Sequence, residues 1–237
     1  MGRSPLWTAI HDSLAGEIAR GHYLPGDRLP TEAQLAERFG VNRHTVRRAL
    51  AGLAAAGTVF ARRGAGVFVR HRPTPYLIGQ RVRFHQNLLA AGRVPEKRIV
   101  LLETRSADQD ERLALQLDQG AQVQVYEGIS LSDGAPIAMF RSVFPASRFP
   151  RMLEELQSSR SVTAAFAAHG VTDYTRASTE ITAKAASTTR AVQLQMSPGD
   201  PILRTVGINV DGDAIPVEYG TSWFAGDRVA LTLEADT

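Results

Sequence analysis

Apolar residues recur at helical spacing three times within the first 57 residues. The first set is Trp7, Ile10, Leu14 and Ile18, and a run with this period predicts an amphipathic helix. A second helix is predicted after Thr31, a residue type that caps helix N-termini, and it ends at Gly40. A third begins at Arg43 and carries its apolar side chains at Val46, Ala49, Leu50 and Leu53. A three-residue turn separates the last two helices, which predicts a helix-turn-helix.

Two short runs rich in valine and phenylalanine follow the third helix. Residues 58–63 and 66–70 both favour β-strand and are joined at Gly64. We therefore expect a β-hairpin, the wing of a winged helix-turn-helix domain. Arg62 and Arg63 lie at its tip beside glycines, whose small size lets the backbone approach a phosphate closely.

The second half of the chain contains one pattern twice, about 78 residues apart. Each copy reads as a helix, an apolar strand, an Asp-Gly turn and a second strand. The first copy spans residues 111–149 and the second residues 189–228. Two such units predict an α+β domain with one mixed or antiparallel sheet, helices on its face and a cleft at the pseudo-twofold centre.

These patterns divide the chain into three parts. Residues 1–72 form the predicted winged helix-turn-helix DNA-binding domain, residues 73–78 a linker, and residues 79–237 a ligand-sensing α+β domain. Pro73 and Pro75 restrict the linker, so a change in the second domain can alter the orientation of the first.

Charge separates the two domains. Residues 1–72 carry eleven arginines, no lysine and five acids, a net charge of +6, whereas residues 73–237 carry −3. A small basic domain joined to an acidic one indicates that the first domain meets a polyanion. The chain has no cysteine, which excludes disulfides, thiolate metal sites and thiol nucleophiles. With no secretory signal and no run of roughly 18 apolar residues, we expect a cytoplasmic protein without membrane contact.

The start of the third helix offers the candidate base-reading side chains. Its apolar positions face inward, which leaves a polar set where a recognition helix touches DNA: Arg43, His44, Thr45, Arg47 and Arg48. The arginine side chain can donate two hydrogen bonds to one guanine base. A solvated basic helix face would show the same pattern, but the adjoining basic wing favours DNA.

The first domain resembles the GntR family of bacterial regulators. The matching segments are residues 29–32 (Leu-Pro-Thr-Glu), residues 43–50 (Arg-His-Thr-Val-Arg-Arg-Ala-Leu) and residues 64–69 (Gly-Ala-Gly-Val-Phe-Val). The resemblance implies DNA contacts at six positions, which are Thr31, Arg43, His44, Thr45, Arg47 and Gly64. Two basic neighbours, Arg48 and Arg62, complete the candidate DNA-binding set. Ala33 departs from the pattern, since some members place a DNA-contacting arginine there.

The second domain resembles the ligand-sensing UTRA domain of the HutC branch of that family, which shares the fold of chorismate lyase. Three segments carry the likeness: residues 83–88, residues 174–183, and residues 216–219 with Asp227 and Arg228. Within the branch, the phosphonate-metabolism regulators are the most similar. Because one recognition helix reads only a few base pairs, we expect a homodimer on a palindromic operator in double-stranded DNA. The resemblance implies a repressor that the ligand releases.

Enzyme motifs are missing from the sequence. It contains no Gly-x-Ser-x-Gly elbow, phosphate-binding loop, dinucleotide glycine fingerprint or His-Glu-x-x-His helix. The six histidines are scattered, so we expect no metal site, no cofactor and no catalytic residue. Two other functions stay open, a lyase on the related fold and a purely architectural DNA-binding protein. Saturable binding of a metabolite by residues 73–237 would argue against the latter.

We expect the effector to be a small phosphorus oxyanion, phosphate or a phosphonate. Sugar-phosphate-sensing relatives use two arginines and a glutamate at the positions of Gly128, Ser130 and Phe140, and those ligands are missing here. The remaining candidates combine arginine forks, a helix N-terminus and an acid that can pair with an amino group. They are Arg83, Phe84, His85, Arg141, Ser161, Arg176 and Glu218. Arg141 and Arg176 can equally be solvated or bound to sheet carboxylates, and a sugar phosphate or another carboxylate metabolite is the alternative effector.

Overall fold

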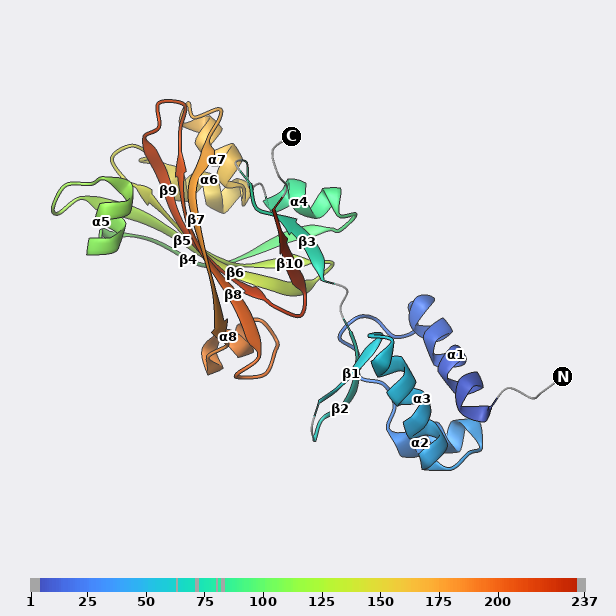
Figure 1. The fold of residues 1–237 in the computed structure, drawn as a ribbon. Helices are drawn as coiled ribbons and strands as arrows, with labels where there is room; N and C mark the ends of the chain where they lie inside the picture. Colours follow the sequence, from blue (N-terminus) through green and yellow to red (C-terminus); the bar gives the residue numbers. More distant parts are fainter. Residues whose placement is uncertain (1–4, 63, 71–72, 80, 82–83, 234–237) are drawn as a thin grey trace. The chain divides into compact units, whose positions relative to one another are not determined.

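The computed structural model describes residues 5–62, 64–70, 73–79, 81 and 84–233, and of His85 it describes the backbone alone. The chain forms two compact units, residues 1–72 and 73–237 (Figure 1). Among the described residues, the first unit holds three helices and a β-hairpin. The second holds a six-stranded sheet, a two-stranded sheet and the remaining helices.

The first unit has the winged helix-turn-helix fold. Its elements are α1 (Leu6–Ala19), α2 (Glu32–Phe39), α3 (Arg43–Ala55), β1 (Val59–Arg62) and β2 (Gly66–Val69). Most side chains predicted to face inward are buried, among them Leu14, Val46 and Leu53, whereas Trp7 and Ile18 are partly buried against the same core. β1 and β2 pair antiparallel and form the wing. The fold predicted for this unit is confirmed.

Local capping fixes where the helices of the helix-turn-helix begin and end. The Thr31 hydroxyl accepts a hydrogen bond from the Gln34 N–H (3.3 Å), and the Gln34 side chain accepts one from the Thr31 N–H (2.9 Å). Gly40 ends α2 at φ 63°, a conformation that glycine adopts without strain. Asn42, which we expected only in the turn, also caps α3 by accepting a hydrogen bond from the Thr45 N–H (2.9 Å).

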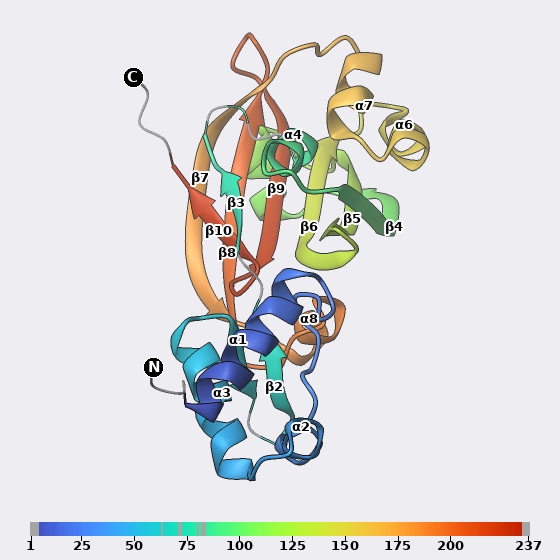
Figure 2. The same ribbon diagram turned by 90° about the vertical axis from the view of Figure 1, so that its right-hand side faces the viewer.

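The sheet of the second unit is antiparallel, with strand order β4-β5-β6-β9-β8-β7 (Figure 2). The strands are β4 (Pro95–Ser106), β5 (Gln122–Ser132), β6 (Ala135–Pro145), β7 (Thr175–Ala185), β8 (Pro201–Val210) and β9 (Pro216–Ala225). The first repeat supplies β5 and β6 and the second supplies β8 and β9, so the two copies meet at the β6–β9 pair. The predicted α+β fold with one antiparallel sheet is confirmed.

Helices cover the two faces of this sheet. The bounds are α4 (Phe84–Ala90), α5 (Gln109–Leu115), α6 (Met152–Ser159), α7 (Val162–Ala168) and α8 (Thr188–Gln193). Along β6, Phe140 and Phe144 join the core under α6 and α7, while Met139 packs beside α8 and Val143 beside α5. Neighbouring residues of a strand point to opposite faces, so α6 and α7 lie on one face and α5 and α8 on the other.

The segment expected as a linker, residues 73–78, is largely a strand. β3 (Thr74–Leu77) pairs parallel with β10 (Val229–Thr232), close to the other end of the second unit's sequence. The buried Tyr76 holds β3 in place, because its ring lies 5.1 Å from that of Phe224 on β9. Burial of this aromatic side chain outweighs the restriction that prolines impose on a strand.

The connection between the two strands differs from one repeat to the other. In the first, Asp133 (φ 51°) and Gly134 (φ 80°) form the two-residue hairpin turn that the sequence predicts. In the second, the connection runs from Asp211 to Ile215, and the positive φ belongs to Ala214 (61°) rather than to Gly212. The Asp211 carboxylate accepts hydrogen bonds from two backbone N–H groups of this loop and stabilises it. The hairpin expected in the second copy is therefore present, but its loop is longer than the two-residue Asp-Gly turn of the first.

Candidate DNA-binding surface and effector site

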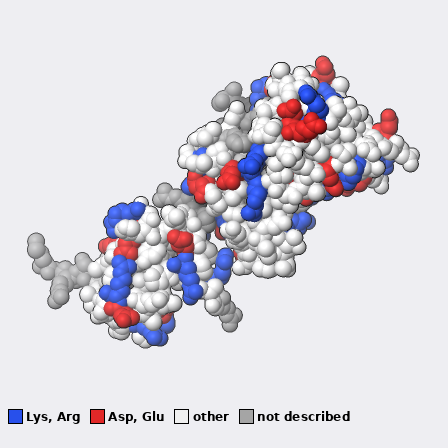
Figure 3. Space-filling view, turned by 180° about the vertical axis from the view of Figure 1, so that it is seen from behind, with Lys and Arg blue, Asp and Glu red and all other residues white. Residues whose placement is uncertain are grey.

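Arg43 and His44 stand exposed at the start of α3. Neither side chain forms a hydrogen bond or an ion pair with another described residue. Thr45 differs, because its hydroxyl donates to the Asn42 side chain (3.0 Å) and supports the cap. The first turn of α3 thus presents two unengaged polar side chains on a rigidly capped helix end. Figure 3 shows several separate basic patches on one face of the first unit, with acidic side chains between them.

Arg47 is held by Glu32 of α2. Its Nε donates to Oε1 (3.0 Å) and its Nη2 to Oε2 (2.8 Å), a bidentate pair between the two helices. Hydrogen bonding from Arg47 lowers the pKa of Glu32, and Glu32 raises the pKa of Arg47. Glu32, the glutamate of the family segment, therefore orients Arg47. To contact a base, the Arg47 guanidinium must either divide its donors between the base and Glu32 or give up this ion pair.

The other candidate DNA contacts lie on the flanks of the recognition helix. The Arg48 guanidinium stacks over the Trp7 ring of α1 (4.8 Å), and Arg62 lies over the rings of Phe60 (5.7 Å) and Phe68 (5.2 Å) in the wing. Gly64 takes a positive φ of 74° at the wing tip. The hydroxyl of Thr31 is engaged in its helix cap, as described above. Arg63 lies outside the described residues.

A cavity of about 400 Å³ lies over the centre of the six-stranded sheet, on the side of α4 and α7. Strands of both repeats form its floor, and hydroxyl groups are frequent in its wall. The lining residues are Tyr76, Phe84, Gln86, Lys97, Ser130, Ala138, Phe140, Ser142, Ser159, Ser161, Val162, Thr163, Tyr174, Arg176, Asn209, Glu218, Ser222 and Phe224.

Glu218 is a buried carboxylate in this cavity. It accepts a hydrogen bond from the Ser142 hydroxyl (2.6 Å) and another from the Asn209 amide (2.6 Å). Ser142 belongs to β6, and Asn209 lies directly opposite Glu218 on the neighbouring strand β8. The two repeats together therefore position one acid, whose remaining lone pairs can receive a cationic or donor group of a ligand.

Arg176 reaches the cavity from the edge strand β7. Its guanidinium lies against Gly207 of β8, where a Cβ would stand 1.6 Å from Nη1, so only glycine leaves room for it. The Nε of Arg176 is buried and has no hydrogen-bond partner among the described residues. A buried donor without a partner is costly, and a bound anion would satisfy it.

Lys97 is a third charged group of the cavity, and sequence reasoning missed it. Its Nζ lies 4.9 to 5.7 Å from the ring centres of Phe84, Tyr126 and Phe140. Burial lowers the pKa of Lys97 to about 8, although the charge of Glu218 acts in the opposite direction. One signal was available in the sequence: of 27 basic residues only two are lysines, Lys97 and Lys184.

Phe140 explains how the cavity differs from the arrangement expected in sugar-phosphate sensors. It lies opposite Gly128 on the neighbouring strand, and a Cβ at position 128 would stand 2.6 Å from its ring. The ring thus fills the space that a side chain at position 128 would need. It also forms one wall of the aromatic enclosure around Lys97.

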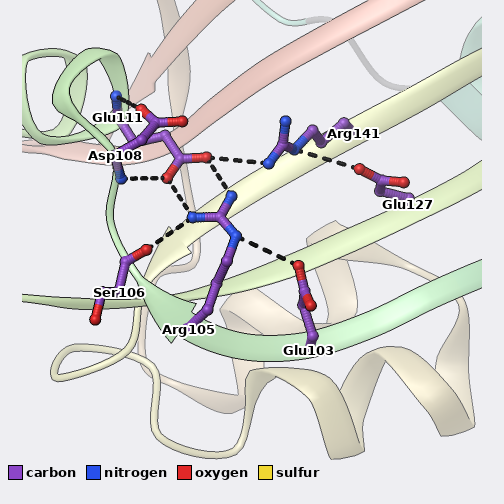
Figure 4. A network of polar contacts seen from close by, with 7 residues as sticks. All are labelled: Glu103, Arg105, Ser106, Asp108, Glu111, Glu127 and Arg141. Carbon is purple, nitrogen blue, oxygen red and sulfur yellow. Dashed lines mark hydrogen bonds and ion pairs between the residues drawn. The ribbon is translucent and has the colours of Figure 1, made fainter.

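Arg141 does not line this cavity, although the sequence placed it among the candidates. It lines a smaller adjoining pocket of about 70 Å³, together with Arg176 and Glu218. It points to the opposite face of the sheet, where it forms ion pairs with Glu111 of α5 (3.4 Å) and Glu127 (3.3 Å) (Figure 4). Arg105 holds the same Glu111 carboxylate at 2.6 Å. Burial raises the pKa of Glu111, but the hydrogen bonds from Arg105 and from the Asp108 backbone outweigh it and leave this pKa lowered.

The structure brings Phe84, Ser161, Arg176 and Glu218 together in one cavity. Ser161 caps α7 as expected, and its hydroxyl accepts a hydrogen bond from the Ala164 N–H (3.2 Å). Arg83 and the side chain of His85 lie outside the described residues. No cluster of three metal-binding side chains occurs in the part of the chain that the structure describes.

A winged helix-turn-helix joined to a sheet domain with a polar cavity defines a class of protein, the transcription regulator that responds to a small molecule. Residues 6–69 match the model of bacterial regulatory proteins of the gntR family, and residues 90–230 match the UTRA domain. The chain therefore belongs to the GntR family, in the HutC subfamily that carries a UTRA domain. This confirms the family expected from the sequence, which is a family of transcription regulators and not of enzymes.

Similar proteins extend along nearly the whole chain. An uncharacterized HTH-type transcriptional regulator, RB1450 of Rhizobium meliloti, is 40% identical over 97% of this chain and 94% of its own length. The probable transcriptional regulator PhnF of Escherichia coli is 32% identical over 91% of this chain and 89% of its own. The crystal structure of PhnF from Mycobacterium smegmatis has a TM-score of 0.68 at 26% identity, covering 96% of this chain and 99% of that one. Among the described residues, no helix is both long and apolar enough to cross a membrane.

Proposed function

We propose that this regulator is a repressor that binds a palindromic operator as a homodimer and is released by a small phosphorus oxyanion, phosphate or a phosphonate. The effector binds in the cavity over the β6–β9 pair. The observation that carries the proposal is the guanidinium of Arg176, which lines the cavity with a buried donor and no partner among the described residues. An arginine fork matches the geometry of a phosphorus oxyanion.

The charges of the cavity favour a ligand that carries both a negative and a positive group. Lys97 and Arg176 supply two cations, and Glu218 supplies one carboxylate. An aminoalkylphosphonate would place its oxyanion near the cations and its ammonium near Glu218. The serine and threonine hydroxyls of the wall can donate to the remaining phosphonate oxygens.

A sugar phosphate is the alternative effector, and the packing around Phe140 argues against it. The ring occupies the space above Gly128, where the sugar-phosphate-sensing relatives are expected to carry a ligand-binding side chain. What remains there is an apolar surface, which cannot satisfy sugar hydroxyls.

Isothermal titration with phosphate, 2-aminoethylphosphonate and a sugar phosphate tests the effector. We expect the phosphonate to bind best and Arg176→Ala to weaken it roughly ten- to hundredfold. Arg93→Ala is the matched control, because Arg93 pairs with Asp133 (3.0 Å) outside the cavity lining and its loss should leave binding unchanged. Preference for the sugar phosphate, or undiminished oxyanion binding when Arg83 and Arg176 are both changed to Ala, would overturn the proposal.

Binding of the effector and of operator DNA must be linked reciprocally if the protein is a ligand-responsive repressor. Half-sites should be centred roughly 10 base pairs apart. Fluorescence anisotropy with a labelled operator, with and without saturating effector, measures the linkage. An effector that binds yet shifts operator affinity by less than twofold would contradict the mechanism.

A further inference from the structure

The two edges of the six-stranded sheet are protected very differently. At the β4 edge, Pro95 begins the strand, a bulge interrupts it between Ile99 and Leu101, and α4 and α6 pack against it. Charged side chains are frequent along it, at Glu96, Lys97, Arg98, Glu103 and Arg105. These are the devices by which proteins prevent an edge strand from pairing with another chain.

The β7 edge has few of these protections. Its eleven residues contain no proline, and beyond the bulge near Ala177 the pairing with β8 is regular. Most of its side chains are exposed on both faces, including Ile181 at 41%. Among the described residues, β8 is the only element that packs extensively against it, and Figure 2 shows β7 at the outer border of the sheet. A long edge strand that lacks proline and is regular over most of its length is a template for strand pairing.

We propose that β7 is the surface through which two copies of this chain pair, antiparallel, about a twofold axis at Thr182. This inference rests on the proposed homodimer and names the surface that forms it. The sequence of β7 carries the argument, because Glu180 and Lys184 stand symmetrically on either side of Thr182. Pairing about that axis places Glu180 of each copy opposite Lys184 of the partner.

The charges of β7 are satisfied between copies and not within one. Glu180 and Lys184 lie on the same face of the strand, since they are four residues apart. Their Cα atoms are separated by roughly 13 Å at about 3.3 Å per residue, which is too far for an ion pair. Neither side chain forms an ion pair with another described residue. Pairing across the axis supplies each with a partner of opposite charge.

Neighbouring registers are less favourable. An axis at Glu180 would place the two Glu180 side chains opposite each other, and like charges in directly opposed positions destabilise a strand pair. The axis at Thr182 also sets Ile181 opposite Ala183 of the partner, which covers the exposed isoleucine on the other face. A second copy is the partner that fits, because the strand is complementary to itself.

Charge reversal in the full-length chain tests the interface. Glu180→Lys or Lys184→Glu alone creates two like-charge contacts per dimer, so each variant should dimerise about tenfold more weakly in sedimentation analysis. An equimolar mixture of the two variants restores both opposite-charge contacts, and native mass spectrometry should then show the mixed dimer as the main dimeric species. Glu96→Lys, on the protected β4 edge, is the control that changes charge equally without affecting the dimer. Circular dichroism checks that each variant is folded.

The possible results distinguish failure of the homodimer from failure of the β7 surface. A wild-type chain that stays monomeric would overturn the homodimer itself. A dimeric wild type whose Glu180→Lys and Lys184→Glu variants dimerise normally would overturn the β7 surface while leaving the homodimer intact. Weakened variants that do not form the mixed dimer would overturn the axis at Thr182.

Discussion

The DNA-binding surface and the effector cavity assemble their charged groups in opposite ways. In the first unit, the candidate base-reading side chains come from one stretch, residues 43–48, and stand exposed on the surface. In the second, the two cations of the cavity come from β4 and β7, the opposite edges of the sheet. DNA is a surface that a short helix can reach, whereas a small ligand must be enclosed. Enclosure requires side chains from distant parts of the sequence.

The ion pairs of the two units also differ in how far they are exposed to water. Glu32 and Arg47 are both substantially accessible to water, with 34% and 63% of their side chains exposed. Glu111, in contrast, is 2% exposed and is shared by Arg105 and Arg141. Water reaches both partners of the first pair but only the arginines of the second, so the two contacts should differ in their contribution to stability.

The largest expected effect is on the stability of the second unit. Glu111→Gln removes the buried carboxylate that Arg105 and Arg141 share and should lower the free energy of unfolding by about 3 kcal/mol. Glu32→Gln removes the accessible pair and should change stability little. Urea denaturation of both variants measures the contrast. Because the pKa of Glu111 is lowered in the folded protein, the wild-type advantage is present above the ordinary glutamate pKa and is lost as the pH falls. Equal effects of the two substitutions would show that burial does not distinguish the pairs.

The next effect is on operator affinity. Arg43→Ala should cost on the order of 1 to 3 kcal/mol and relax the preference for particular bases, because Arg43 is exposed and unengaged at the start of α3. Arg62→Ala in the wing should weaken all DNA sequences alike. Titrations at fixed salt against operator and scrambled DNA separate these outcomes. Unchanged operator binding by Arg43→Ala would mean that α3 does not read the bases.

A smaller effect should appear in the pH dependence of effector binding. The pKa of Lys97 is about 8, so its ammonium is present below that pH and is lost as the pH rises through it. Oxyanion affinity should therefore fall between pH 7 and pH 9. Lys97→Met provides the comparison, since its titration reflects only the ligand and the other groups of the cavity. Parallel pH profiles for the two proteins would exclude Lys97 from the site.

The smallest effect concerns the helix cap in the first unit. Thr31→Ala removes the hydroxyl that accepts from the Gln34 N–H and should lower the free energy of unfolding by about 1 kcal/mol. Thr31→Ser keeps the hydroxyl and should restore most of that loss. Thermal unfolding of the two variants measures it. If both substitutions behave alike, the capping box contributes nothing measurable.

The sequence by itself determined the elements of the first unit and the helix and strand pair of each repeat. Helical spacing, the cap at Thr31 and the stop at Gly40 place the helix-turn-helix, because these signals act between residues three or four positions apart. The internal repeat likewise indicated a mixed or antiparallel sheet with a cleft at its centre. The resemblance to the ligand-sensing domain named Arg176 and Glu218 as candidates, and both line the cavity.

Only the tertiary structure decided which side chains meet. Lys97 enters the cavity because β4 pairs with β5, whereas Arg141 is turned to the opposite face by the alternation of β6. The linker expected at residues 73–78 is a strand because β10, about 155 residues later in the sequence, pairs with it. Periodicity in a sequence fixes local geometry, but strand order and register depend on contacts between distant segments. That is why the elements of the first unit and of the repeats could be predicted, whereas the membership of the effector site could be predicted only in part.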